Sequence, residues 1–439
     1  MIVNVCDALC GQGKTQGCIA MINEDTENRY VFITPYLDEV ERIVRSCRDR
    51  KFVSPERKFT NGYSKLNDLH SLLRAGENIA STHALFAWYT DETRQLLKDN
   101  NYILILDEVI DLFQPLNMDG GDVNLLVRKN IAKRQDGNIV WDDDEYTGVL
   151  FSEVQQMARC NNLIDYDGSF YFWSIPIEVF KSFKEAYVLT YLFEHSILRH
   201  FFEVNGLSYR LIGTKKVDGG HRFCPLEEMD RKIELRDKIH IVQQERYNDI
   251  GNKAFSLSSG WFDRSYQEPD QRPLMILKNN LYNVFRQFDS GAEDKMWTTL
   301  NKYRSVLKGK GYANGFITFN KRATNDFADR HCLAYCLNVF MQPWIKNYLV
   351  RIGVEDVNQD MYALSILIQW IFRSAIRKGE EIHIYIPSRR MRYLLERWLD
   401  NLADGRDLEE IKYDGRKARR NKTEERKLLK KIKDVRRRK

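Results

Sequence analysis

Uninterrupted apolar runs alternate with amphipathic segments along the first 225 residues, and each run ends in polar residues. The runs predict strands in the stretches 1–5, 30–34, 78–83, 102–106 and 185–191. The intervening segments, beginning with 14–22, carry apolar residues at helical spacing. Because continuous apolar strands separated by helices are typical of a parallel sheet covered on both faces, the sequence predicts an α/β fold.

A second series of elements predicts a second parallel sheet downstream. Strands are expected in the stretches 237–244, 272–280, 312–326 (running into a polar turn) and 382–387. Helices are expected at 295–309, 361–381 and 388–403. Residues 112–184, before the last strand of the first sheet, are expected to form a surface excursion followed by helices. This order predicts a first domain at 1–225, a second at 226–403 and a basic tail at 404–439.

The stretch VCDALCGQGKTQG, residues 5–17, leaves the first predicted strand and opens the first predicted helix. In a phosphate-binding loop, backbone N–H groups surround the phosphates and a helix N-terminus faces the same anion. Lys14 would supply charge to the outer phosphates and Thr15 would ligate Mg²⁺, although Ala8 stands where the usual pattern has Gly. The residues expected to hold the nucleotide are Gly11, Gln12, Gly13, Lys14 and Thr15. A Gly-Lys-Thr triplet also arises by chance, so other strand ends must support this interpretation.

The other strand ends of the first domain are also polar, and in a parallel sheet they meet at one edge, where ligands bind. Asp107 and Glu108 end the most apolar strand. Buried charges there need a cation, and Mg²⁺ on a triphosphate suits Asp107. Glu108 is then free to orient and deprotonate the attacking water. The alternative is an ordinary strand-end cap; nucleotide hydrolysis is the favoured interpretation.

A row of polar residues interrupts the apolar helix predicted at 361–381. Gln369, Arg373 and Arg377 recur every four residues, so they are expected to share one face. Solvent is one possible partner for this row. An incoming γ-phosphate fits it better.

Composition predicts a globular cytoplasmic protein with no membrane partner. Of the 439 residues, 43% are hydrophobic, which is ample for ordinary cores. No apolar run approaches the roughly 18 residues needed to cross a bilayer. The eight scattered cysteines form no C-x-x-C pair, which favours packing thiols over a metal site.

Positive charge is concentrated at the end of the chain. Residues 412–439 contain 15 Lys or Arg against 4 Asp or Glu, which is +11, whereas the whole chain carries +6. Such dense charge with few apolar residues cannot bury a core. The segment is expected to be either a solubilising end or an electrostatic tether to nucleic acid.

Taken in order, these motifs resemble the superfamily 2 helicases, which have two RecA-like domains in tandem with ATP between them. The resemblance implies ATP and Mg²⁺ as cofactors, with Asp107 and Glu108 as the magnesium and water-activating carboxylates. It places Gln369, Arg373 and Arg377 in the sixth motif, where an arginine finger stabilises the transition state. Thr190 corresponds to the motif that couples hydrolysis to strand movement. The implied nucleic-acid contacts are Thr34, Pro35, Ser81, Thr82, Arg322, Thr324 and Asn325.

Departures from the family pattern refine this resemblance. Residues 107–110 are neither the DEAD nor the DEAH form, and few residues precede the loop to hold the glutamine motif of DEAD-box RNA helicases, so DNA is favoured over RNA. Arg377 lies four residues after Arg373, where the family has three, which leaves the identity of the finger open.

The overall pattern is similar to compact phage-encoded DNA helicases. It predicts an ATP-dependent DNA helicase for phage replication or recombination, with other replication or recombination proteins as possible partners. A duplex translocase without strand separation and a nucleic-acid-binding scaffold with a degenerate ATP site are the alternatives.

Overall fold

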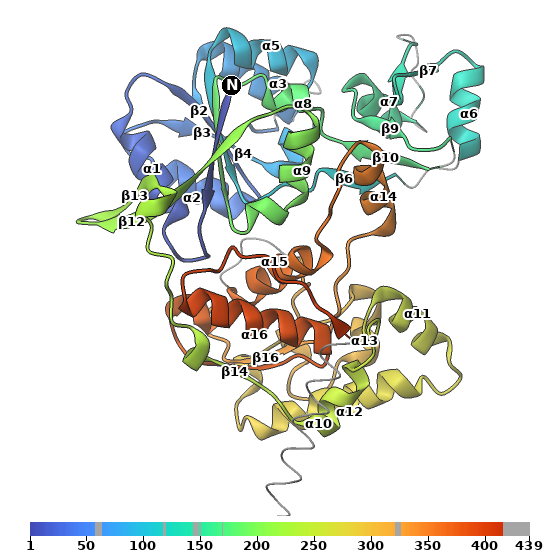
Figure 1. Cartoon of the computed structure of the whole chain (residues 1–439). Helices are drawn as coiled ribbons and strands as arrows, with labels where there is room; N and C mark the ends of the chain where they lie inside the picture. The colour runs from blue at the N-terminus through green and yellow to red at the C-terminus, as the bar shows by residue number, and fades with distance from the viewer. Residues whose placement is uncertain are drawn as a thin grey trace, which may run out of the picture. The chain divides into compact units, whose positions relative to one another are not determined.

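Figure 1 shows the computed structural model of the chain, which describes residues 1–57, 64–116, 120–143, 148, 151–168, 170–320 and 326–415. The chain divides into two compact units. The first comprises Met1–Met229 and Gln342–Val357, and the second comprises Asp230–Met341 and the chain from Asn358 onward. The first boundary therefore falls shortly after the predicted one.

An eight-stranded sheet forms the centre of the first unit, in the order β13-β12-β1-β11-β5-β2-β4-β3. Its strands are β1 (Ile2–Asp7), β2 (Arg29–Thr34), β3 (Phe52–Val53), β4 (Asn78–Thr82), β5 (Tyr102–Asp107), β11 (Glu185–Thr190), β12 (Tyr209–Val217) and β13 (Gly220–Pro225). All neighbours pair in parallel except β12 and β13, which form an antiparallel hairpin. The predicted strands and their common direction are confirmed.

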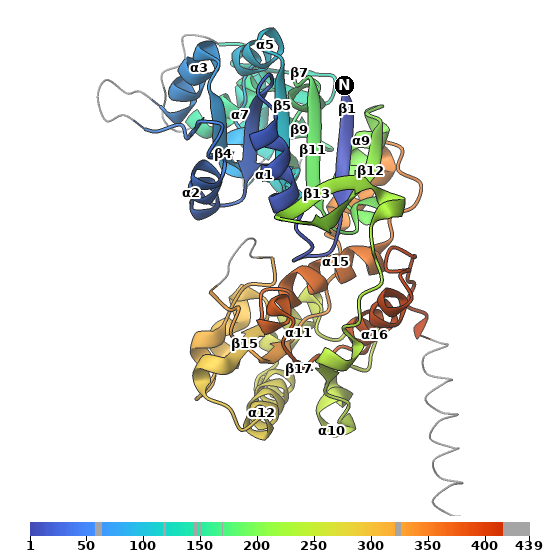
Figure 2. The same cartoon turned by 90° about the vertical axis from the view of Figure 1, so that its left-hand side faces the viewer.

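Helices α1 (Lys14–Glu24) and α2 (Leu37–Ser46) pack against one face of this sheet, beside its strands in Figure 2. Their buried residues Cys18, Ile22, Val40 and Ile43 join one hydrophobic cluster with residues of the sheet. The other helices of the first unit's main fold are α3 (Lys65–Ala75), α4 (His83–Phe86), α5 (Asp91–Asp99), α8 (Ile177–Phe180) and α9 (Ile197–Val204). Burial of the central strands on both faces explains why their apolar runs are uninterrupted.

Residues 113–174 form a small sheet of their own, which corrects the expectation of a surface excursion. Five short strands pair antiparallel in the order β6-β10-β9-β8-β7. The elements are β6 (Phe113–Pro115), α6 (Gly120–Arg128), β7 (Ala132–Gln135), β8 (Asn138–Trp141), α7 (Ser152–Arg159), β9 (Leu163–Asp165) and β10 (Tyr171–Ser174). Strands of three or four residues are too short to show a clear period, so the sequence did not reveal them.

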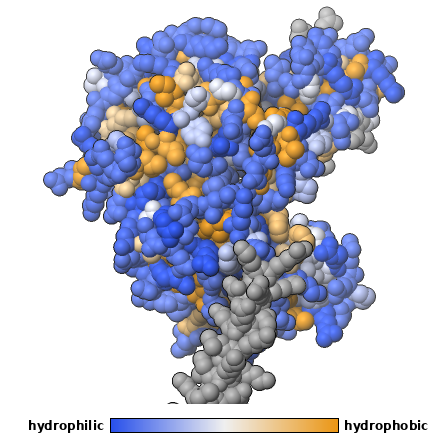
Figure 3. Space-filling view, in the orientation of Figure 1, coloured by the Kyte–Doolittle hydropathy of each residue, from blue (hydrophilic) through white to orange (hydrophobic). Residues whose placement is uncertain are grey.

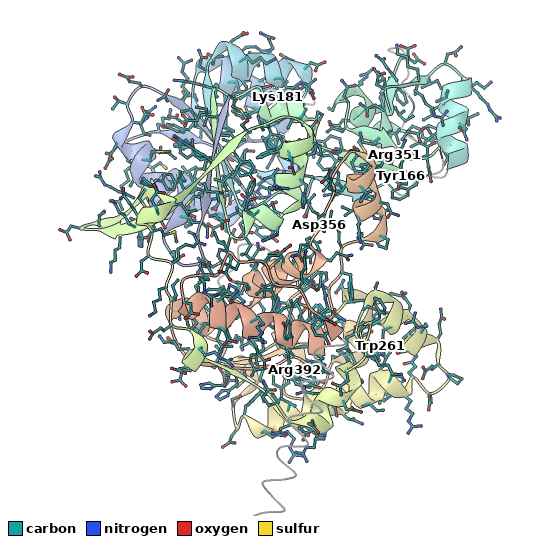
Figure 4. All side chains as sticks on the ribbon, in the orientation of Figure 1. Tyr166, Lys181, Trp261, Arg351, Asp356 and Arg392 are labelled. Carbon is teal, nitrogen blue, oxygen red and sulfur yellow. The ribbon has the colours of Figure 1, made fainter. Side chains whose placement is uncertain are left out.

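Helix α14 (Pro343–Arg351) packs on this small sheet, although it lies between two elements of the second unit along the chain. The Tyr348 ring lies 4.8 Å from Phe172 and 5.3 Å from Phe113, measured between centroids. Arg351 lies 5.5 Å above the Tyr166 ring and donates a hydrogen bond to the Tyr166 carbonyl (Figure 4). These contacts assign residues 342–357 to the first unit, where the sequence analysis had placed them in the second domain.

Buried Arg390 joins the second-unit residues on either side of the inserted segment 342–357, called the arm below. Its guanidinium donates to the Val339 carbonyl before the arm at 2.7 Å. After the arm it donates to the Gln359 carbonyl at 2.9 Å and the Asp360 carboxylate at 2.6 Å. The arm thus leaves and rejoins the second unit at two places that the Arg390 side chain bonds together.

The second unit contains a four-stranded parallel sheet in the order β14-β17-β16-β15. Its strands are β14 (Ile239–Ile241), β15 (Lys295–Thr298), β16 (Cys332–Tyr335) and β17 (Ile382–Tyr385). Its helices are α10 (Glu245–Asn248), α11 (Ser259–Gln267), α12 (Arg272–Gln287), α13 (Arg304–Leu307), α15 (Gln359–Ile371) and α16 (Arg389–Ala403). The predicted elements at 237–244, 382–387 and 388–403 are confirmed.

Three other second-unit predictions were wrong. The expected strand at 272–280 is the start of α12, where Leu274, Leu277 and Leu281 are buried at helical spacing. The expected helix at 295–309 opens with the buried strand β15. No strand forms in the described part of 312–326, where Phe316 makes a single bridge to Trp297. Short apolar runs do not distinguish strand from buried helix by periodicity alone.

The face shown in Figure 3 is mostly hydrophilic with small apolar patches, in keeping with 30% charged residues. Among the described residues, no helix has the length and apolar character to span a bilayer.

Candidate nucleotide-binding site

The loop between β1 and α1 has the backbone shape that its glycines predict. Gly13 is the N-cap of α1 with φ 78°, and Gly11 has φ 89°, so both occupy the left-handed region that favours glycine. Ala8 does not need to be glycine: its φ is not positive, and its methyl group is fully buried in the core beneath the loop. The departure at this position is therefore accommodated by packing.

The Lys14 side chain forms hydrogen bonds to the backbone of its own loop. Its Nζ donates hydrogen bonds to the carbonyls of Ala8 at 2.6 Å and Leu9 at 3.2 Å. The Gln12 side chain accepts from the Leu9 N–H at 2.7 Å. A lysine held by neutral carbonyls beside a helix N-terminus is positioned to exchange them for phosphate oxygens.

Thr15 and Asp107 meet although 92 residues separate them. The Thr15 hydroxyl, in the first turn of α1, donates to Asp107 Oδ2, at the end of β5, at 3.3 Å. In the sheet, β11 lies between β5 and β1, the strand that precedes the loop. Burial and, after it, the neighbouring Glu108 charge raise the Asp107 pKa, Lys14 lowers it, and together these effects bring it to about 7. A bound cation would stabilise the ionised form of this carboxylate.

Glu108 is held in an unusual backbone conformation. Its φ is 63°, which is rare for a residue other than glycine, and its N–H donates to the Leu189 carbonyl at 3.0 Å. Its Oε2 atom is buried and accepts no hydrogen bond from any described residue. Backbone strain together with an unsatisfied buried oxygen is characteristic of functional sites.

The end of β11 is tied directly to the loop. The Ala8 N–H donates to the Thr190 carbonyl at 3.1 Å. The buried Asp7 carboxylate accepts from the N–H groups of Leu192 at 2.8 Å and Phe193 at 3.0 Å. Sequence reasoning did not single out Asp7; its position at the end of an apolar strand, like that of Asp107, was the available signal.

The structure brings the residues expected to contact nucleic acid at β2 and β4 together, but it buries two of the four. Thr34 and Thr82 are paired in neighbouring strands, with Ser81 just before Thr82. Thr34 and Ser81 are buried, and Thr82 caps α4 by accepting from the Leu85 N–H at 3.4 Å. Pro35 is half-buried. Arg322, Thr324 and Asn325 lie outside the described residues, so their role stays a prediction.

Gln369, Arg373 and Arg377 do not share one helix face. Helix α15 ends at Ile371, and a separate short 3₁₀ helix (Ala375–Lys378) carries Arg377. The Ser374 hydroxyl bonds the Ile371 carbonyl at 2.6 Å, which diverts the backbone from the helix. As a result Gln369 is half-buried, Arg373 is buried and Arg377 is exposed.

Comparison with known proteins identifies the family. The YonV middle domain model matches residues 113–173, and the YonV C-terminal Rossmann-like domain model matches residues 233–399. A Bacillus subtilis (strain 168) relative, described as SPbeta prophage-derived uncharacterized protein YonV, is 38% identical over 413 residues, covering 91% of this chain and 99% of its own. This chain belongs to the YonV family. The relative's prophage origin agrees with the expected similarity to phage-encoded proteins.

The YonV family domains coincide with the structure. The middle domain is the small antiparallel sheet from β6 to β10, and the Rossmann-like domain contains the second parallel sheet. A solved structure described as S. tokodaii Xpd4 aligns over 90% of this chain and 93% of its own, with 12% identity and a TM-score of 0.48. The two parallel-strand sheets and the Rossmann-like domain match confirm the α/β class predicted from sequence for this YonV-family chain.

Replacing Asp107 with Asn is expected to stabilise the nucleotide-free YonV-family protein at alkaline pH. With the folded pKa near 7 and the unfolded one near 3.9, the free energy of unfolding falls as pH rises from about 4 to about 7. Asp107→Asn removes this loss, so its Tm at pH 8 should exceed that of the wild type by at least about 4 °C, while the two agree near pH 4. Thermal unfolding at both pH values, without metal or nucleotide, makes the comparison. A variant no more stable at pH 8 would show that Asp107 is not strained by burial.

Proposed function

We propose that this YonV-family chain is an ATP-dependent DNA helicase of superfamily 2, with RecA-like parallel-sheet domains. One observation carries the proposal: the Thr15 hydroxyl, next to Lys14 at the start of α1, and the Asp107 carboxylate at the end of β5 meet at 3.3 Å. A loop lysine, a following hydroxyl and a strand-end carboxylate are the groups that phosphoryl transfer requires.

The residues present fit a magnesium-bound nucleotide. Hydroxyl and carboxylate oxygens are ligands that Mg²⁺ prefers, and burial disfavours the Asp107 carboxylate unless a cation is near. When bound, Mg²⁺ neutralises charge on the phosphates. Lys14 would leave the Ala8 and Leu9 carbonyls to bind the outer phosphate, and the unpaired Glu108 oxygen would accept a proton from the attacking water.

The movement caused by nucleotide binding and hydrolysis would be transmitted to the nucleic-acid contacts through β11. Because the loop and the Thr190 carbonyl are joined at Ala8, a shift of the loop on nucleotide binding would also move the end of β11. Thr34 and Thr82 would have to become more exposed than they are in this structure to contact the sugar-phosphate backbone of nucleic acid. Contacts to that backbone carry little sequence specificity. A prophage-derived relative supports a role in phage DNA replication or recombination, in the host cytoplasm and alongside proteins of that pathway.

The test is ATP hydrolysis measured in parallel with single-stranded DNA, duplex DNA, branched DNA and RNA, together with a strand-displacement assay. The proposal predicts the greatest stimulation by DNA, accompanied by strand displacement. Hydrolysis stimulated by duplex without displacement would instead identify a translocase. Nucleic-acid binding without hydrolysis would identify a scaffold with a degenerate ATP site.

The basic segment 416–439, which lies outside the described residues, is expected to act as a tether. Residues 404–415, assigned to the tail from sequence, belong instead to the second unit, because Asp407 pairs with Arg231 at 2.9 Å and Ile411 is buried. Truncation after Gly415 should therefore weaken DNA binding. It should also make the slope of log affinity against log salt concentration less negative by a few units, because each duplex phosphate contact contributes about −0.9 to that slope.

The maximal ATPase rate should change little on this truncation, since the proposed catalytic groups precede residue 380. The measurement is DNA affinity over a range of salt concentrations. An unchanged salt slope would contradict the tether, and a collapsed maximal rate would show that the segment belongs to the motor.

A further inference from the structure

The β12–β13 hairpin lies against the proposed phosphate loop, and sequence reasoning gave it no role. The Thr214 hydroxyl in β12 donates a hydrogen bond to the Gln12 carbonyl at 2.7 Å. Strand β13 runs beside α1, where a Cβ added to Gly17 would touch the Arg222 backbone at 3.5 Å. Gly13 and Gly17 are one helical turn apart, so the loop and the first turn of α1 present a glycine-lined side to the hairpin.

His221, the second residue of β13, rests directly on Gly13. A Cβ added to Gly13 would lie 2.2 Å from both Cγ and Cδ2 of the His221 ring, so only glycine allows this contact. The imidazole therefore touches the backbone immediately before Lys14.

The His221 ring is not satisfied where it lies. Its Nδ1 atom is buried and has no hydrogen-bond partner among the residues that the structure describes. Buried polar atoms without partners are uncommon in folded proteins, and each costs stability unless another molecule satisfies it. An imidazole nitrogen can donate a hydrogen bond, and the molecule expected beside Gly13 is rich in acceptor oxygens.

We infer that His221 is a nucleotide-binding residue, which the β12–β13 hairpin supplies to the phosphate loop by donating a hydrogen bond from Nδ1 to an oxygen of bound ATP. This inference rests on the proposed function. Thr214 holds the hairpin in register with the loop, and Gly13 makes room for the ring. The hairpin is then part of the nucleotide site rather than a cover for the sheet edge.

Two substitutions at His221 separate hydrogen bonding from packing. His221→Phe keeps a ring of similar size on Gly13 but removes both nitrogens, and His221→Ala removes the ring. Because a hydrogen bond to a charged oxygen is stronger than one between neutral groups, we expect both variants to raise the Kd for ATP by about tenfold or more. The ATP-induced rise in Tm should shrink correspondingly, while the nucleotide-free Tm of His221→Phe stays at or above that of the wild type.

Arg222→Ala is the matched control, because Arg222 is the next residue of β13 and its side chain pairs with Glu24 at 2.6 Å, not with the loop. Its Kd for ATP should stay within about twofold of the wild type, whereas Lys14→Ala should lose binding. Wild-type affinity in His221→Phe, with binding lost in Lys14→Ala, would overturn the role of His221 and leave the proposed function standing. Failure of the wild-type protein to bind ATP would overturn both.

Discussion

Glu108→Gln is expected to bind ATP with near-wild-type affinity and to hydrolyse it about 10²–10⁴-fold more slowly, because a positioned general base contributes a rate factor of about that size. Glutamine preserves the size of the side chain and its backbone setting, but it cannot take a proton from water. The buried, unpaired oxygen of Glu108 marks it as the acceptor. Nucleotide affinity and steady-state ATP hydrolysis, measured on the same preparation, separate binding from chemistry.

Lys14→Ala and Asp111→Asn are the two control variants for this experiment. Lys14→Ala removes the charge that would meet the outer phosphates, so both binding and turnover should fall. Asp111→Asn changes an exposed carboxylate three residues beyond Glu108 and should turn over at close to the wild-type rate. If Glu108→Gln matches the wild-type rate, Glu108 does not activate the water.

Arg377→Ala is expected to lower nucleic-acid-stimulated hydrolysis by at least about 10²-fold while fold and ATP binding persist, since an arginine finger acts on the transition state. Of the two candidate arginines, Arg377 is exposed on the short helix after α15, whereas Arg373 is buried. Lys378→Ala is a matched control, because this neighbouring cation pairs with Asp329.

Arg373→Ala should behave differently from Arg377→Ala. Truncating a buried arginine removes packing and hydrogen-bonding capacity, so the main loss is expected in Tm, ahead of any effect on the chemical step. Thermal unfolding and stimulated ATPase rates of both variants make the assignment. Near-normal stimulated rates in both would mean that neither arginine serves as the finger.

Sequence patterns were sufficient for the strands β1, β2, β4, β5 and β11 of the first sheet, because each is a local apolar run, whereas β3 and the β12–β13 hairpin were not predicted. Each central strand is buried on both faces and stops at a polar residue, so β5 and its Asp107–Glu108 end can be recognised without knowing their neighbours. The Gly13-Lys14-Thr15 turn requires the left-handed backbone that glycine permits. The meeting of Thr15 with Asp107 then follows from the parallel direction of the strands.

Features that depend on packing between distant segments could not be predicted from local sequence patterns. The sequence of α14 is that of an ordinary half-buried helix, and it does not indicate that Tyr348 packs against Phe113 and Phe172 of the small sheet. The break after Ile371 depends on a serine hydroxyl and on pairing of the Ala375 N–H with the Arg330 carbonyl. His221 carries no motif at all, and only its contact with Gly13 draws attention to it.

The most direct test of the account is the rate of phosphate release from Mg-ATP by the purified full-length protein, with and without single-stranded DNA. The account predicts turnover that DNA stimulates and that Glu108→Gln lowers by at least about 10²-fold. Turnover that DNA does not change, or that stays near the wild-type rate in Glu108→Gln, would contradict it.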